Sequence, residues 1–168
     1  MKEIPLTRGY VALVDDGDWE DLSQYNWRVH LNRQMVYATR DTKAGDGRWT
    51  TVRMHRQILD APAGVEVDHI DGDGLNCQRE NIRLCTGTEN KQNTRKRRGA
   101  SSQFKGVCWR KRRHVWRAYA KTGASRLYLG DFAIEADAAR AYDAAAREHF
   151  GEFAAVNFPG AGERGCVT

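Results

Sequence analysis

The sequence lacks the long apolar runs of membrane proteins, since no hydrophobic stretch approaches the ~20 residues that a membrane-spanning helix needs. Its first residues, Met1 to Pro5, lack the apolar core of a secretory signal. With 40% hydrophobic and 29% charged residues, the 168-residue chain has the composition of a folded soluble protein, either one domain or two small modules. We therefore expect a protein that has no membrane partner, is not secreted and works in the cytoplasm of its host cell.

Cysteine pairs with metal-ligand spacing are also missing. The four cysteines are Cys77, Cys85, Cys108 and Cys166, and no two of them are separated by two residues. No paired histidines complete a tetrahedral site either. We therefore expect no structural zinc, and we interpret the cysteines as small, partly buried residues without redox chemistry.

Acidic residues are absent from a long central segment, residues 91 to 128, which holds 13 Lys and Arg. The rest of the chain has 14 basic and 22 acidic residues. A basic run can be a solvated face or a disordered tail. Here it is interleaved with the aromatic residues Phe104, Trp109, Trp116, Tyr119 and Tyr128. This mixture indicates a folded surface that presents cations to the phosphates of a nucleic acid.

The pattern of residues predicts an α+β fold. Strands are expected at 10–14, 27–31, 36–39, 49–54, 66–70 and 81–85, where β-branched and aromatic residues are frequent. Residues 15–18 and 44–47 have the composition of turns. Thr86 and Glu89 form a capping-box pattern, which predicts a helix from Gly87 to about residue 97 with Asn90 in its first turn.

A second pattern follows the polar segment 99–102. Strands are predicted at 106–110, 115–121 and 125–130, and alanines at helical spacing predict a helix from residue 134 to Gly151. Alternation along the middle strand directs Trp116, Ala118 and Ala120 toward the helix, and Leu127 and Leu129 would face inward from the next strand. We therefore expect a three-stranded antiparallel sheet packed on one helix. The outward positions Arg117, Tyr119, Lys121, Arg126 and Tyr128 form a basic and aromatic surface.

Four residues between the two patterns carry candidate chemistry. Asp68 and His69 are adjacent, Asn81 follows twelve positions after the histidine, and Asn90 follows nine positions later. Phosphodiester hydrolysis needs an activated water and a Lewis acid held on a rigid scaffold. In a strand–strand–helix unit, Asp68 and Asn90 would converge on one hard cation, Mg²⁺ or Mn²⁺, while His69 faces the phosphate. Taken singly, a histidine is more often structural and an Asn-rich loop is more often a turn.

The joint pattern is more specific. It comprises Met54-His55-Arg56, residues 67–73 (VDHIDGD), Leu75-Asn76, residues 80–83 (ENIR) and Glu89-Asn90. This resembles the HNH homing-type endonucleases of bacteriophages and mobile introns, which have a ββα-metal (His-Me finger) nuclease module. The resemblance covers residues 1–95, including the strand-rich N-terminal leader.

The resemblance implies a role for each residue of the motif. It implies that His69 is the general base and that Asp68 and Asn90 are the ligands of a single divalent metal. Asn81 would pin the loop between the strands and help to orient the histidine, so it is assigned to the catalytic set. His55 and Arg56 match a recurrent pair with a supporting or DNA-contacting role.

A second resemblance covers residues 102–159. The stretches 104–107 (FKGV), 116–118 (WRA), 127–132 (LYLGDF), 138–145 (AARAYDAA) and 155–159 (AVNFP) resemble the Apetala-two, or ethylene-response-factor, DNA-binding domain. That family lays its sheet in the major groove, which implies that the groove-facing residues are Lys105, Arg110, Tyr119, Lys121, Arg126 and Tyr128. Cys108 and Tyr119 depart from the residues typical of the family, so its base preference does not transfer. Arginine contacts to guanine and to phosphate both remain open.

Together these observations predict a nuclease module with its leader at 1–95, a basic linker at 96–103, a DNA-binding domain at 104–159 and a tail at 160–168. The expected function is site-directed, strand-nicking cleavage of double-stranded DNA by a monomer without an obligate protein partner. A DNA-binding transcription regulator with an inactive nuclease half is one alternative. An RNA-binding protein that uses the basic and aromatic sheet is another.

Overall fold

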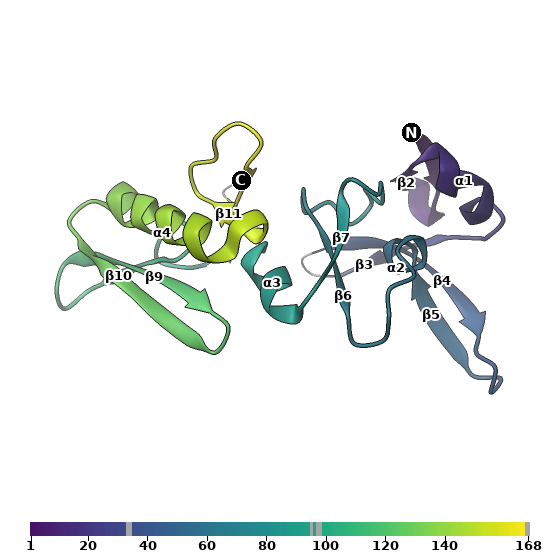
Figure 1. Cartoon of the computed structure of the whole chain (residues 1–168), viewed down its shortest axis with the longest axis horizontal. Helices are drawn as coiled ribbons and strands as arrows, with labels where there is room; N and C mark the ends of the chain where they lie inside the picture. Colours follow the sequence, from purple (N-terminus) through teal and green to yellow (C-terminus); the bar gives the residue numbers. More distant parts are fainter. Residues whose placement is uncertain (33–34, 95, 97–98, 167–168) are drawn as a thin grey trace. The chain divides into compact units, whose positions relative to one another are not determined.

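The computed structural model describes residues 1–32, 35–94, 96 and 99–166. The chain divides into two compact units, Met1–Thr86 and Gly87–Thr168 (Figure 1). Both units combine helices with antiparallel sheets, so the expected α+β class is confirmed. No helix in the described ranges is long and apolar enough to cross a membrane.

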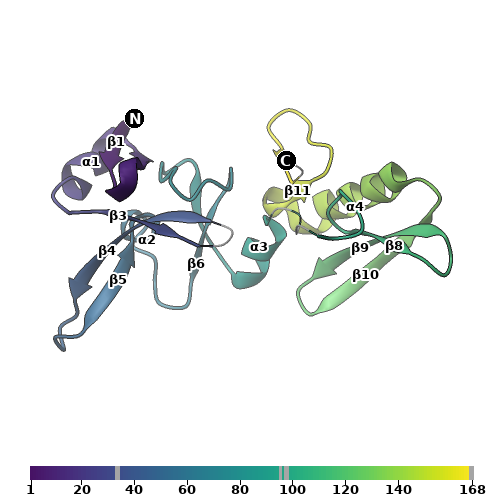
Figure 2. The same cartoon turned by 180° about the vertical axis from the view of Figure 1, so that it is seen from behind.

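The first unit contains three small antiparallel sheets, visible from both sides in Figures 1 and 2. They are β1 (Lys2–Pro5) with β2 (Val11–Val14), β3 (Arg28–Leu31) with β4 (Val36–Lys43) and β5 (Trp49–Arg53), and β6 (Glu66–His69) with β7 (Ile82–Cys85). The short 3₁₀-helix η1 (Thr7–Gly9) joins the first two strands. No strand was predicted at the position of β1. The other strands lie within two residues of the predicted ones, except that β4 runs four residues further.

Two helices of this unit differ from the sequence-based prediction. Residues 15–18 were expected to form a turn, but α1 (Asp16–Leu22) begins there with Asp15 at its N-cap. Acidic residues in a first turn stabilise a helix by interacting with its dipole, and the completely buried Leu22 anchors the other end. The second helix, α2 (Met54–Ile58), begins where the strand 49–54 was expected to end.

The core of the first unit collects one or two residues from nearly every element. Its most buried members are Ala12, Val14, Leu22, Ala38, Met54 and Cys77. The long loop between β6 and β7 is fixed to β2, because Leu13 N donates to Leu75 O at 2.9 Å and Cys77 N donates to Leu13 O at 2.8 Å. The loop that follows Asp68 and His69 is therefore part of the fold of the first unit.

The second unit begins with α3 (Gly87–Gln92), and the remainder of the expected helix up to residue 97 is not assigned as helix or lies outside the described residues. Its sheet has the order β10 (Ser125–Phe132), β9 (Val115–Thr122), β8 (Val107–Arg110), and all neighbours are antiparallel. The helix α4 (Glu135–Phe150) covers one face of this sheet (Figure 1). The 3₁₀-helix η2 (Gly151–Phe153) and the parallel strands β11 (Ala155–Val156) and β12 (Arg164–Gly165) complete the unit.

Small side chains allow α4 to lie close to the sheet, as the alanine pattern predicts. Ala118 and Ala120 of β9 are completely buried against the helix. Gly106 precedes β8 with φ 75°, and a Cβ atom at this position would collide with the ring of Tyr142. Leu127 was expected to face inward, but it is 38% exposed near the end of the edge strand β10.

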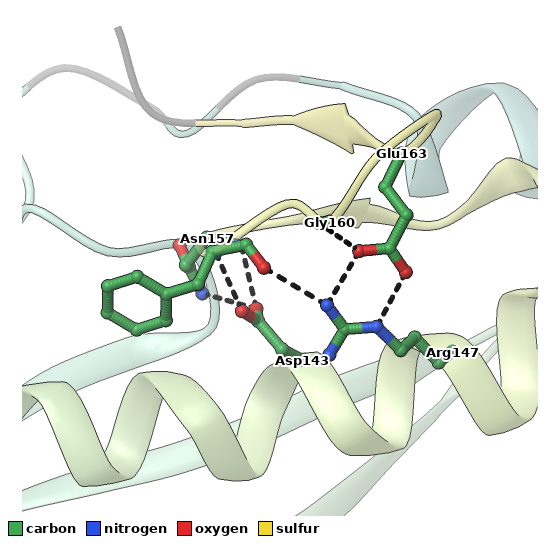
Figure 3. Close-up of polar contacts among 6 residues, drawn as sticks. Asp143, Arg147, Asn157, Gly160 and Glu163 are labelled. Carbon is green, nitrogen blue, oxygen red and sulfur yellow. Dashed lines mark hydrogen bonds and ion pairs between the residues drawn. The ribbon is translucent and has the colours of Figure 1, made fainter.

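The C-terminal segment, of which residues 160–168 were predicted to be a tail, is fastened to α4. Asp143 is buried, and its carboxylate accepts hydrogen bonds from Asn157 N at 2.7 Å, Asn157 Nδ2 at 3.0 Å and Phe158 N at 2.8 Å (Figure 3). One turn later, Arg147 forms an ion pair with Glu163, which also accepts a hydrogen bond from Gly160 N. The segment through Cys166 therefore belongs to the folded unit.

Candidate functional site

The strand pair β6–β7 places two of the candidate residues. Asp68 lies opposite Arg83, and His69 lies opposite Ile82. Alternation along β6 directs the side chains of Asp68 and His69 to opposite faces of the strand pair. Both side chains are buried, with 5% of Asp68 and 2% of His69 exposed. The scaffold thus holds a carboxylate and an imidazole next to each other, but on different faces.

Asn81 fixes both ends of the loop between these strands. Its Nδ2 donates to Asp71 Oδ1 at 3.0 Å and to Asn76 O at 2.8 Å, while its Oδ1 accepts from Asp71 N at 3.0 Å. In addition, Ile70 N donates to Asn81 O at 2.8 Å, directly after His69. Asn81 is therefore placed to hold the backbone that carries the histidine.

A group of aromatic rings surrounds His69. The ring of His55 meets it edge-on with centroids 4.7 Å apart, and the ring of Tyr37 lies 5.2 Å from His55 and 5.9 Å from His69. Burial, followed by the neighbouring His69, lowers the pKa of His55 to about 3. His55 is therefore neutral at physiological pH and contacts His69 as an uncharged ring.

Arg56, the second residue of the expected pair, supports the chain that enters β6. Its guanidinium donates to the carbonyl oxygens of Ala61, Pro62 and Val65. These bonds close the turn between α2 and β6 and hold His55 in place from the neighbouring position. The geometry agrees with a supporting function for Arg56.

Asn90 lies on α3, which belongs to the second unit. The structure therefore brings Asp68, His69 and Asn81 together in the first unit and places Asn90 in the other. Within the second unit, α3 contacts η2, and Lys105 Nζ donates to the carbonyl oxygen of Gln92 at the end of α3. These contacts explain why the compact units divide at residue 86, before the boundary at residue 95 that the sequence suggested.

The sheet of the second unit presents the basic and aromatic surface on the face away from α4. Arg126 stacks on Tyr119, with its guanidinium carbon 4.4 Å from the ring centroid, and Arg117 lies 5.1 Å from that of Tyr128. Arg117 also pairs with Asp131 through two hydrogen bonds of 2.7 and 2.9 Å. A shallow pocket of about 200 Å³ on this surface is lined by Cys108, Arg110, Arg117, Tyr119, Arg126 and Tyr128. Lys121 is exposed on the same strand as Tyr119.

Lys105 differs from the other residues that were expected to face DNA. Its amine points inward, donates to Gln92 O and lies 6.0 Å from the ring centroid of Tyr142. Burial lowers the pKa of Lys105 to about 8. The structure therefore places six of the seven predicted DNA-facing residues on the sheet surface and turns Lys105 toward the interior.

Comparison with known proteins finds two family matches along the chain, the first of which extends six residues beyond the end of the first unit. Residues 60–92 match the model of the HNH endonuclease family, and residues 102–152 match the model of the AP2 domain. An uncharacterized HNH endonuclease of Acanthamoeba polyphaga mimivirus is 30% identical over 156 residues, which is 89% of this chain and 76% of that protein. The chain belongs to the HNH endonuclease family.

Protein 3.8 of Escherichia phage T7 is a second relative of this HNH protein. It is 39% identical over 70 residues, and the match covers 39% of this chain and 58% of the phage protein. The chain thus spans little more than half of that relative. No solved structure matches the chain. Both family assignments that the sequence motifs suggested, HNH endonuclease and Apetala-two type domain, are confirmed.

The first unit, Met1–Thr86, contains most of the HNH match and is called the HNH unit below. It contains three residues near the site that sequence reasoning did not identify. Arg83 forms an ion pair with Asp68, Tyr37 contacts both histidine rings, and Cys77 lies next to them. Burial raises the pKa of the Cys77 thiol to about 12, so the thiol is protonated at physiological pH. Arg83 lies within the motif at 80–83, but Tyr37 and Cys77 carry no local signal because only the tertiary fold brings them to His69.

Proposed function

We propose that this protein is a site-directed DNA endonuclease of the homing type that nicks one strand. The observation that carries the proposal is the placement of Asp68 and His69 side by side on β6, with the adjoining loop fixed by Asn81. The family relationship supports nuclease chemistry. The AP2 domain supports a DNA target.

The donor set fits a hard divalent cation. Asp68 offers carboxylate oxygens and Asn90 an amide oxygen, which are the ligands that Mg²⁺ and Mn²⁺ prefer. A bound divalent cation would stabilise negative charge on the scissile phosphate and on the leaving oxygen. The carboxylate of Asp68 is already oriented, because it is buried and bonded to Arg83. Asp68 and Asn90 would thus be the metal ligands, as the HNH motif implies.

His69 would act as the general base. An imidazole nitrogen accepts a proton from the attacking water, and the protonated ring later releases that proton to solvent. The packing of His55 and Tyr37 against the ring restricts its orientation, since a buried aromatic side chain in contact with two others has few rotamers left. Asn81 would contribute by holding the backbone of residues 70 and 71, so that the base keeps its position during attack.

The AP2 domain would select the DNA site through its sheet. Five of the outward residues lining the sheet pocket are arginines or tyrosines, which can bond to phosphates and base edges or stack on exposed bases. Arg110, Arg126 and Lys121 are exposed and available for such contacts. Arg117 is oriented by Asp131 and would contact DNA from a fixed position.

One experiment tests the proposal directly. The purified protein is incubated with phage or host DNA, with and without Mg²⁺, and any breaks are mapped at single-nucleotide resolution. We expect breaks at defined sites that require the cation. Replacing His69 with Ala should lower the rate about a hundredfold while DNA binding is retained. His30→Ala, which changes an exposed histidine of the same unit, is the matched control. Unchanged cleavage by His69→Ala would remove this residue from the mechanism.

A further inference from the structure

Three potential metal ligands from separate parts of the HNH unit meet beside β6. His55 comes from α2, His69 from β6 and Cys77 from the loop between β6 and β7. Their ligand atoms, an imidazole nitrogen from each histidine and the cysteine sulfur, all lie within 4.8 Å of one another. The exposed fractions of these residues are 2%, 2% and 0%. The cluster is therefore a compact group of donors shielded from solvent.

The backbone around the cluster is held in place. Cys77 N donates to Leu13 O at 2.8 Å, and the Cys77 thiol lies 3.9 Å from Gly74 O, so the loop carries the sulfur in a defined position. The bonds of Arg56 fix the helix that carries His55. Because each donor has its own support, the three donors do not depend on one flexible segment.

The buried Nδ1 atom of His55 has no hydrogen-bond partner among the described residues. Leaving a buried polar atom unsatisfied costs about 1 to 3 kcal/mol, and native structures normally avoid it. An imidazole ring binds a metal ion through the lone pair of one nitrogen. A cation held between His55, His69 and Cys77 would satisfy this side chain.

We propose that His55, His69 and Cys77 bind a borderline or soft divalent cation such as Zn²⁺, at a site distinct from the hard-cation ligands Asp68 and Asn90. Imidazole nitrogen and thiolate sulfur are the characteristic ligands of Zn²⁺, whereas Mg²⁺ prefers oxygen. Binding converts the Cys77 thiol to a thiolate and releases its proton to solvent, and water completes the tetrahedron.

The geometry requires a small adjustment. With Zn–N of about 2.1 Å and Zn–S of about 2.3 Å, donors in a tetrahedral site lie about 3.5 Å apart. The ligand atoms now lie within 4.8 Å of one another, so they must approach by about 1 Å when the ion binds. Rotation of the side chains can provide this movement. The backbone supports described above need not move.

Binding at this site would have a functional consequence, and this part of the inference rests on the proposed nuclease function. A ring nitrogen of His69 that donates its lone pair to Zn²⁺ can no longer accept a proton from water. Zinc would therefore inhibit cleavage, even when Mg²⁺ is present in excess.

The site is tested without reference to cleavage by titrating the full-length protein with Co²⁺, a spectroscopic substitute for Zn²⁺. We expect visible bands of tetrahedral cobalt and a thiolate-to-cobalt charge-transfer band, both displaced by one equivalent of Zn²⁺. Cys77→Ser and, independently, His55→Gln should weaken Co²⁺ binding at least about tenfold, because each removes one of three protein ligands. Cys85→Ser changes another buried cysteine of the same unit and should leave the spectrum unchanged.

Asp68→Asn separates the two metal sites. The charge-transfer band should persist in this variant, because Asp68 is not among the three ligands. Absence of the band in the unaltered protein, its persistence in Cys77→Ser, or its loss in Asp68→Asn would each overturn the proposal. Circular dichroism shows whether each variant is folded. If Cys77→Ser does not fold, the loss of Co²⁺ binding is tested with His55→Gln instead.

Inhibition is measured as the ratio of cleavage rates with and without Zn²⁺ at constant Mg²⁺, for each variant separately. We expect at least a tenfold reduction in the unaltered protein and in Cys85→Ser, and a much smaller one in Cys77→Ser. If no DNA is cleaved at all but the cobalt spectra behave as expected, the nuclease proposal fails and the zinc site stands. Cleavage that is insensitive to Zn²⁺ would overturn the inhibitory consequence.

Discussion

Arg83 lies opposite Asp68 in the register of β6 and β7 and donates two hydrogen bonds to the same carboxylate oxygen, 3.1 Å from Nε and 2.9 Å from Nη2. Only 13% of the arginine side chain and 6% of the aspartate side chain are exposed. A cation bound to Asp68 would therefore share its ligand with a fixed positive charge. Such a neighbour weakens metal binding through Coulomb repulsion, but it balances the buried carboxylate when no metal is bound.

Replacing Arg83 with Gln should therefore have two opposite effects. Without a divalent cation, the free energy of unfolding of the HNH unit should fall by about 3 kcal/mol, because a buried ion pair is broken. The Mg²⁺ concentration for half-maximal cleavage should also fall, by several-fold. Chemical denaturation in a chelator and cleavage at varied Mg²⁺ measure the two effects. Arg79→Gln, which breaks the more exposed pair with Asp18, is the control and should not change the Mg²⁺ requirement.

Cleavage by this protein should produce nicks. The chain has one HNH motif, and one site cannot address the antiparallel phosphates of both strands without reorienting. A supercoiled plasmid that carries the target should convert to open circles at low protein concentration, with linear product late or absent. Early linear product, formed at a rate that rises with the square of the protein concentration, would instead indicate a dimer that cuts both strands.

The sheet surface of the AP2 domain should account for the salt dependence of DNA binding. Arg126→Gln and Lys121→Gln each remove one exposed cation, so each should lower the slope of log affinity against log salt by about one. Gel shifts of the full-length protein at several salt concentrations measure this slope. Arg140→Gln on α4 removes an exposed cation that pairs with Asp137 away from the sheet, and it should leave the slope unchanged. Equal slopes for all variants would place the DNA contact elsewhere.

The buried His55 should make the HNH unit sensitive to acid. Its pKa is about 3 in the folded protein and 6.5 ordinarily, so the folded state binds fewer protons than the unfolded state between these values. Its contribution to stability is therefore complete above pH 6.5 and is lost as the pH falls toward 3, by up to about 1.4 kcal/mol per pH unit. Denaturation at pH 7, 6 and 5 should show a smaller loss in His55→Gln than in the unaltered protein. His30→Gln should lose as much stability on acidification as the unaltered protein. An equally large loss of stability in His55→Gln would show that His55 is not the source of the acid sensitivity.

The sequence predicted regular elements well where one periodicity extends over several residues. The strands of the AP2 domain and α4 follow from alternation and from the spacing of alanines. The helix α1 was not predicted, because Asp15 to Asp18 has a composition that suits both a turn and a helix N-terminus. Whether these residues form a turn or begin a helix depends on the burial of Leu22, which is a tertiary contact.

The candidate site shows the same limit. Asp68, His69 and Asn81 were identified because they belong to one short motif. The ion pair of Arg83 depends on the β6–β7 register, and the approach of Tyr37 and Cys77 to His69 depends on packing between distant segments. A zinc site was not expected because no pair of cysteines has ligand spacing. The cluster instead draws its donors from residues 55, 69 and 77, which the fold brings together.

The bonds to Asp143 determine how much of the chain must be transferred when the DNA-binding unit is moved to another protein. The match to the AP2 family ends at residue 152, but Asn157 and Phe158 supply the donors to the buried carboxylate of Asp143. A graft that ended at residue 152 would leave this charge inside the domain without those donors, at a cost of several kcal/mol. The shortest segment that keeps these bonds in another protein therefore extends at least through Phe158, beyond the end of the family match.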